Sequence, residues 1–143
     1  CFLILIFVQI AIGAFVSGMD AGKIYNSWPL MGSTYFPNDN NISNLFKLSA
    51  FDDPSLVQFI HRNLAYVISI FYLLILFKIY RNKIYDLYRS VNLLGIIIII
   101  QVFLGVFTIL YGAQILIASM HQLSSIFLVS SCIYFIYVNT KFN

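Results

Sequence analysis

Four long apolar stretches dominate this sequence and limit what the chain can fold into. They cover approximately residues 1–17, 56–78, 91–111 and 114–138, and crossing the hydrocarbon core of a bilayer takes about 20 apolar residues per helix. Only 9% of the 143 residues are charged, too few to cover the surface of a soluble domain. The pattern predicts an all-α integral membrane bundle of four helices, with a long loop over residues 18–55.

The first apolar stretch is short for a membrane span and starts on Cys1, without an initiator methionine. It lacks the basic region and the small-residue cleavage site of a signal peptide. We therefore expect a truncated helix in a chain that is a piece of a longer protein. Cys1 and Cys132 both fall on the inner side and have no C-x-x-C spacing, so neither a disulfide nor a zinc site is expected.

Basic residues gather on one side of the predicted membrane. Four of them connect the second and third helices and Lys141 follows the fourth, whereas the loop over residues 18–55 carries four aspartates against two lysines. The basic side of a membrane protein faces the cytoplasm or its equivalent. The long loop and the tight turn at residues 111–114 should therefore lie on the outer side. The lipid bilayer is the expected partner, and nothing indicates binding to nucleic acid.

The long loop is expected to have structure of its own. Its aromatic residues, Trp28 among them, suit the membrane interface. Residues 42–48 have the pattern of a short interfacial helix. Asp53 followed by Pro54 is typical of a helix start, because an aspartate is a good N-cap and proline is tolerated in the first turn.

The four predicted helices form two similar pairs. Residues 9–15 of the first helix match residues 101–107 of the third, and His61 near the start of the second matches His121 near the start of the fourth. Weak internal symmetry of this kind is common in membrane proteins built from duplicated units. Because both pairs run in the same direction, we expect a pseudo-twofold axis along the membrane normal.

His61 and His121 are the two histidines of the chain and are candidate axial ligands of a haem iron. They lie about five and seven residues into their helices, roughly 7–11 Å below the outer surface at about 1.5 Å per residue. Ionisable residues inside a membrane are costly and mark function, and two facing imidazoles suit haem iron. The alternative is that each histidine only hydrogen-bonds a neighbouring helix.

Small residues beside the histidines leave room for a flat ligand. Ala65 and Ser125 lie one turn beyond His61 and His121, on the same helix faces. Gly13 and Gly105 allow the neighbouring helices to approach closely, as small residues do in membrane bundles with or without a cofactor. The glycines therefore do not distinguish the two interpretations.

Other polar residues lie near the outer ends of the helices. Arg62 could pair with a haem propionate, because a guanidinium matches a carboxylate in shape, or extend to lipid phosphate. Gln58 could also bond a propionate or be solvated. Asp20 either accepts bonds from backbone N–H groups or is a solvated turn residue, and the second interpretation is favoured.

The sequence resembles haem A synthase of the mitochondrial and alphaproteobacterial type. The resemblance is carried by residues 13–22 and 25–31 around the first loop, by the histidine-containing segments 57–66 and 120–122, and by residues 101–108. It covers nearly the whole chain. It implies that residues 1–143 are a C-terminal, haem b-binding transmembrane domain, half of an eight-helix enzyme of a bacterial or mitochondrial inner membrane.

The family resemblance also implies a reaction, oxidation of a methyl group of haem O to the formyl of haem A for cytochrome oxidase assembly. It implies a haem b held by His61 and His121, with Arg62 beside it. Haem O would bind through an N-terminal half outside this chain, so we expect the fragment alone to be inactive. Haem O synthase and an electron donor are further expected partners, and no catalytic residue is predicted. The alternatives are a bis-histidine b-type electron-transfer subunit and a haem-free membrane scaffold.

Overall fold

The computed structural model describes residues 2–141, which fold into helices joined by short connections and one long loop. These residues contain no β-strand, only an isolated bridge between Met31 and Thr34. The predicted all-α class is therefore confirmed. The four α-helices are α1 (Phe2–Gly18), α2 (Pro54–Arg81), α3 (Tyr88–Leu110) and α4 (Ile115–Lys141).

Three of these helices, α2, α3 and α4, are long and apolar enough to cross a membrane. Helix α1 is apolar but has 17 residues in the described part of the chain. Helices α2 and α4 run to residues 81 and 141 rather than to the expected 78 and 138. Basic residues occupy their last turns, where a positive charge is favourable beside the helix C-terminus. Cys1 lies outside the described residues, and Cys132 is a buried free thiol.

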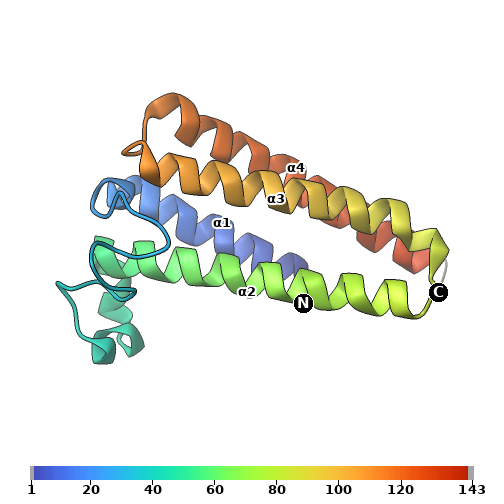
Figure 1. Ribbon diagram of the computed structural model, residues 1–143, viewed down its shortest axis with the longest axis horizontal. Coiled ribbons are helices and arrows are strands. Elements are labelled where there is room, and N and C mark those ends of the chain that lie inside the picture. Colours follow the sequence, from blue (N-terminus) through green and yellow to red (C-terminus); the bar gives the residue numbers. More distant parts are fainter. Residues whose placement is uncertain (1, 142–143) are drawn as a thin grey trace.

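The helices form two antiparallel pairs, α1 with α2 and α3 with α4, that lie side by side (Figure 1). Helix α3 also contacts α2, and α4 contacts α1, which closes the bundle. The long loop and the α3–α4 turn are at one end, and the α2–α3 connection is at the other (Figure 1). The two connections thus share an end, as the sequence indicates. The side of the membrane that this end faces stays a prediction.

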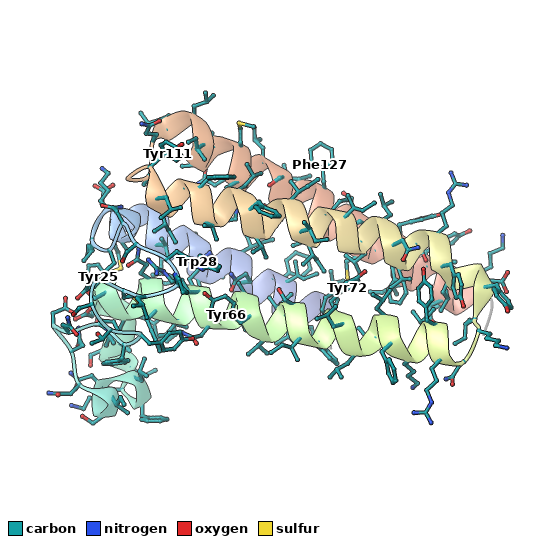
Figure 2. All side chains as sticks on the ribbon, viewed as in Figure 1. Tyr25, Trp28, Tyr66, Tyr72, Tyr111 and Phe127 are labelled. Carbon is teal, nitrogen blue, oxygen red and sulfur yellow. The ribbon has the colours of Figure 1, made fainter. Side chains whose placement is uncertain are left out.

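Side chains along the middle of the bundle are mostly carbon, whereas nitrogen and oxygen atoms gather towards its two ends (Figure 2). This distribution is expected of a lipid-facing bundle, because the bilayer core offers no partner for polar groups. The buried apolar core lies mainly among α2, α3 and α4, away from the long loop. Among the described residues, the buried polar side chains other than Ser90 and Ser131 lie in the half of the bundle next to the loop.

The long loop contains three of the four short 3₁₀-helices and is tied to the start of α2. Asp53 accepts a hydrogen bond from the backbone N–H of Leu56 at 3.1 Å, so the predicted N-cap is confirmed. The single helix expected over residues 42–48 is instead split in two. The 3₁₀-helices are η1 (Ala21–Lys23), η2 (Ile42–Phe46), η3 (Leu48–Asp52) and η4 (Tyr85–Leu87).

Asp39 connects two distant parts of the loop region. Its carboxylate accepts hydrogen bonds from Ser55 at 2.6 Å and from Tyr25 at 3.1 Å. Burial acts to raise the pKa of Asp39, but the hydrogen bonds from Ser55 and Tyr25 outweigh it and leave that pKa below its usual value. The ionised carboxylate therefore joins the start of the loop to the first turn of α2.

Tyr72 fixes the contact between α2 and α3 in the core (Figure 2). Its buried hydroxyl donates a hydrogen bond to the carbonyl of Val91 at 3.2 Å. A Cβ atom on Gly95 would lie 1.9 Å from the Tyr72 hydroxyl oxygen, which is closer than any non-bonded contact allows. Glycine at position 95 is therefore required for the two helices to pack as they do.

The substitution Gly95→Ala should destabilise the bundle by about 1–3 kcal/mol, because the added methyl group displaces the Tyr72 ring and its hydrogen bond. Thermal unfolding in detergent, followed by circular dichroism, measures the effect. Gly18→Ala is the matched control, since a Cβ there meets no atom within 4 Å. Equal midpoints for Gly95→Ala and the wild type would contradict this account of the contact.

Candidate functional site

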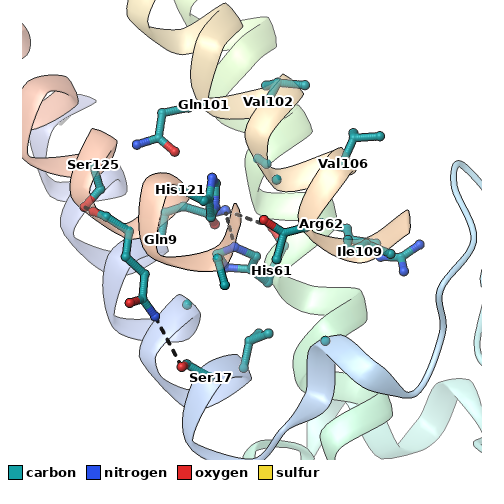
Figure 3. Close-up of a pocket in the computed structure, with 18 of the residues that line it drawn as sticks. Gln9, Ser17, His61, Arg62, Gln101, Val102, Val106, Ile109, His121 and Ser125 are labelled. Atoms are coloured by element: carbon teal, nitrogen blue, oxygen red, sulfur yellow. Dashed lines mark hydrogen bonds between the residues drawn. The ribbon is translucent and has the colours of Figure 1, made fainter. Parts of the chain in front are cut away.

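One cavity of about 640 Å³ lies between the two helix pairs, near the loop end of the bundle. Cofactor and small-molecule sites commonly measure roughly 300–1,000 Å³. All four helices and the loop contribute to its wall, which is mostly apolar. His61 from α2 and His121 from α4 both line this cavity (Figure 3). The structure thus brings the two candidate ligands to one site, and iron binding by them stays a prediction.

Each histidine lies against a glycine of the other helix in its pair. A Cβ on Gly13 of α1 would lie 3.0 Å from Cε1 of His61, and one on Gly105 of α3 would lie 3.2 Å from Cε1 of His121. The two glycines are at matching positions of the sequence repeat. The internal symmetry therefore extends to the immediate surroundings of both rings.

A glutamine precedes each of these glycines by four residues, on the same helix face. The side-chain amide of Gln9 donates to the His61 carbonyl at 3.0 Å and lies 3.4 Å from Nε2 of the His61 ring (Figure 3). Gln101 holds the matching position on α3 and is 9% exposed. The sequence predicted the repeat but not the role of its glutamines, although a glutamine inside a long apolar run is itself a signal.

Six buried side-chain atoms in residues 2–141 have no hydrogen-bond partner, and every one belongs to a residue that lines this cavity. Buried polar atoms are almost always paired in folded proteins. Their confinement to one cavity makes it the place inside the bundle where a ligand or ordered water would supply hydrogen-bond partners. The atoms are Gln9 Oε1, Gln58 Oε1, His61 Nδ1, Arg62 Nε, Gln101 Nε2 and His121 Nδ1.

Arg62 extends from α2 to the long loop and not to the lipid surface. Its guanidinium donates to the carbonyls of Ser27 at 2.8 Å, Tyr25 at 2.9 Å and Leu30 at 3.3 Å. The side chain is 7% exposed. The interpretation that Arg62 reaches lipid phosphate is therefore wrong. Pairing of Arg62 with a propionate stays a prediction. The Nε atom is the one guanidinium nitrogen without a hydrogen-bond partner, so it is the atom that would donate to the propionate.

Gln58, one turn before Arg62, supports the same segment of the loop. Its amide donates to the Tyr25 carbonyl at 3.1 Å, and its side chain is 1% exposed. The interpretation of Gln58 as a solvated residue at a helix end is therefore wrong. Its Oε1 atom is unbonded, and a bond from Gln58 to a propionate stays a prediction.

Two further contacts attach the loop at its end of the cavity. The Trp28 indole donates to the Tyr66 hydroxyl at 2.9 Å, and both side chains line the cavity. Asn26 donates to the carbonyl of Ile109 near the end of α3, at 3.0 Å. The loop is thereby attached to both helix pairs across the cavity.

Asp20 lies at the rim of the cavity and pairs with Lys23 at 2.7 Å. Both side chains are exposed, and Asp20 makes no side-chain cap bond to the backbone of η1. An exposed pair of this kind stabilises a protein by about 0–1 kcal/mol. The structure therefore agrees with the favoured interpretation of Asp20 as a solvated turn residue.

The fold and the cavity define an all-α membrane protein with a cofactor-sized site between two similar helix pairs. Residues 1–133 match the cytochrome oxidase assembly protein family (COX15-CtaA), and the chain belongs to this family. The family resemblance in the sequence is thereby confirmed.

Curated relatives are named heme A synthase. The chain is 44% identical to the protein of Pelagibacter ubique (strain HTCC1062) over 137 residues, which are 96% of this chain and 40% of that protein. It is 42% identical to the protein of Rickettsia bellii (strain RML369-C) over 91% of this chain and 38% of that protein. The chain therefore spans about two fifths of the length of these relatives. No solved structure matches it.

Replacing Arg62 should release the loop while leaving the helices folded. A bond from a charged donor contributes about 1.5–3 kcal/mol, so Arg62→Leu should speed limited proteolysis of the loop at least tenfold. Arg62→Lys should give partial protection, because a single ammonium cannot reach the same set of carbonyls. Arg81→Leu, at the opposite end of α2, is the control. Unchanged cleavage of Arg62→Leu would show that the loop is held by other contacts.

Proposed function

We propose that this chain forms the haem b-binding, C-terminal half of a haem A synthase. This enzyme is an oxidoreductase that converts a methyl group of haem O to the formyl group of haem A. The observation that carries the proposal is the pair of histidines in a cavity where the unpartnered buried polar atoms of residues 2–141 collect. The names of the curated relatives support the enzyme class.

The donor set of the cavity fits haem better than a bare metal ion. Among the described residues, no group of three or more His, Cys, Asp or Glu side chains could hold a metal ion. Two imidazoles suffice when the iron brings its equatorial ligands with the porphyrin, as in bis-histidine cytochromes. The mostly apolar wall of the cavity suits the apolar faces of a macrocycle. The absence of a side chain at Gly13 and Gly105 leaves room for the imidazole rings that would bind the iron.

A bound haem b would supply one-electron transfer at this site. His61 and His121 would hold the iron, and the Nε atom of Arg62 would donate to a carboxylate at the edge of the macrocycle. The loop that Arg62 fixes would cover part of the cavity at that end and limit the entry of water, and a drier site strengthens electrostatic interactions. A haem-free scaffold would instead have to satisfy the six unpartnered buried polar atoms with ordered water.

In this proposal, haem O binds to the part of the enzyme outside this chain, and the cofactor in this half exchanges electrons with a donor. The protein would reside in a bacterial or mitochondrial inner membrane, with the long loop on the outer side. The charge asymmetry supports this orientation. Haem O synthase, which supplies the substrate, is a further proposed partner.

The chain expressed with haem available should give a low-spin b-type absorption spectrum. His61→Ala and His121→Ala should each abolish or strongly alter it, because one axial ligand is lost. Ser130→Ala, on the exposed surface of α4, is the control and should leave the spectrum unchanged. A wild-type spectrum in both histidine variants would refute axial ligation by these residues.

The chain alone should not convert haem O to haem A. Its five acidic residues are all aspartates, four in the long loop and Asp86 at the opposite end, so none lies within a membrane helix. Asp20, the one at the rim of the cavity, is exposed and paired with Lys23. A cofactor without a positioned substrate has nothing to react with. Haems extracted from cells that make haem O and carry this chain can be separated by chromatography. Haem A above the empty-vector background would place the reaction in the cavity of this half.

A further inference from the structure

Two matched helix faces lie against the rings of the candidate ligands, at Gly13 on α1, where Gln9 also contacts His61, and at Gly105 on α3. Gln101 holds the position on α3 that Gln9 holds on α1. We propose that these faces are positioning elements, which fix the rotation of the His61 and His121 imidazoles and thereby the field that the two rings impose on a haem iron. The inference rests on the proposed function, since it concerns how the rings present their nitrogens to the metal.

The glycine contacts show which edge of each ring is held. At Gly13 an added Cβ would lie 3.0 Å from Cε1 of His61 and 3.7–3.8 Å from its two nitrogens. At Gly105 the corresponding distances to His121 are 3.2 Å and 3.6–3.7 Å. In both cases the Cε1 edge of the imidazole, which lies between the two ring nitrogens, faces the backbone of a glycine. A methyl group at either position must therefore move both nitrogens of the ring together.

The glutamines make the two faces unequal. Gln9 bonds the His61 carbonyl and contacts Nε2 of its ring, so the His61 backbone and ring are tied to the same amide. Gln101 is buried with its Nε2 atom unbonded. His61 therefore has less freedom to yield to a new methyl group than His121, and its glycine contact is also the shorter one. We expect Gly13→Ala to have the larger effect.

Close helix packing alone would also favour glycine at these positions, but it predicts a different result. If the glycines served packing only, alanine would lower the stability of the haem-free bundle and leave the spectrum of any haem-bound protein unchanged. If they position the rings, the electronic signature of the bound iron changes even in variants that fold normally.

The test uses the chain purified in detergent and titrated with haemin, with electron paramagnetic resonance as the readout and circular dichroism as the check on folding. Gly13→Ala and Gly105→Ala should stay low-spin but shift the largest g value, with haem affinity roughly 10- to 100-fold weaker, as for residues that orient metal ligands. Gly18→Ala, on α1 but with no atom within 4 Å of its added Cβ, should match the wild type.

Gln9→Leu gives an independent measurement, because it removes the amide from the His61 ring without adding bulk at the glycine. It should also shift the largest g value, and it decides the matter if Gly13→Ala does not fold. Wild-type g values and affinity in Gln9→Leu and in each glycine variant that folds would overturn the proposed positioning. Failure of the wild type itself to bind haemin is a separate result, which would overturn the proposed function and this inference together.

Discussion

The need to satisfy polar groups inside a lipid-facing bundle is the constraint on which the rest of this structure depends. The bilayer core offers them no partner, so polar side chains within the helices must meet other protein groups or a ligand. Gln9, Gln101 and the two histidines all turn into one space between the helix pairs. The pairs separate there and pack on apolar side chains elsewhere. The position of the cavity and its polar lining thus both follow from the need to keep these side chains away from lipid.

Much of this arrangement could be predicted from the sequence because its determinants are local or repeated. Apolar runs and an N-cap such as Asp53 locate helices through short-range physics, and the repeat places His61 and His121 at equal depth. The α-helical class, the family and the shared end of the long loop and the α3–α4 turn followed from these patterns. The structure then added the common cavity, while haem binding there stays a prediction.

The contacts of Arg62 could not be predicted, and the reason is physical. Its partners are backbone carbonyls of Tyr25, Ser27 and Leu30, more than 30 residues away in the sequence. Every residue presents a carbonyl, so no side-chain pattern identifies which carbonyls will accept. The same holds for Gln58. The crossing of Tyr72 over Gly95 likewise depends on the relative depth of two helices, which composition does not determine.

The bonds of Arg62 also make the two histidines mechanically different. His61 is its neighbour in the chain, so the loop backbone and one imidazole are attached to the same turn of α2. His121 belongs to a helix that follows a turn of only a few residues. A displacement of the loop would therefore act on the His61 ring through the neighbouring residue Arg62. It would act on the His121 ring through the packing of the surrounding helices. The two candidate ligands, although nearly symmetric in their surroundings, therefore differ in how directly they are connected to the loop.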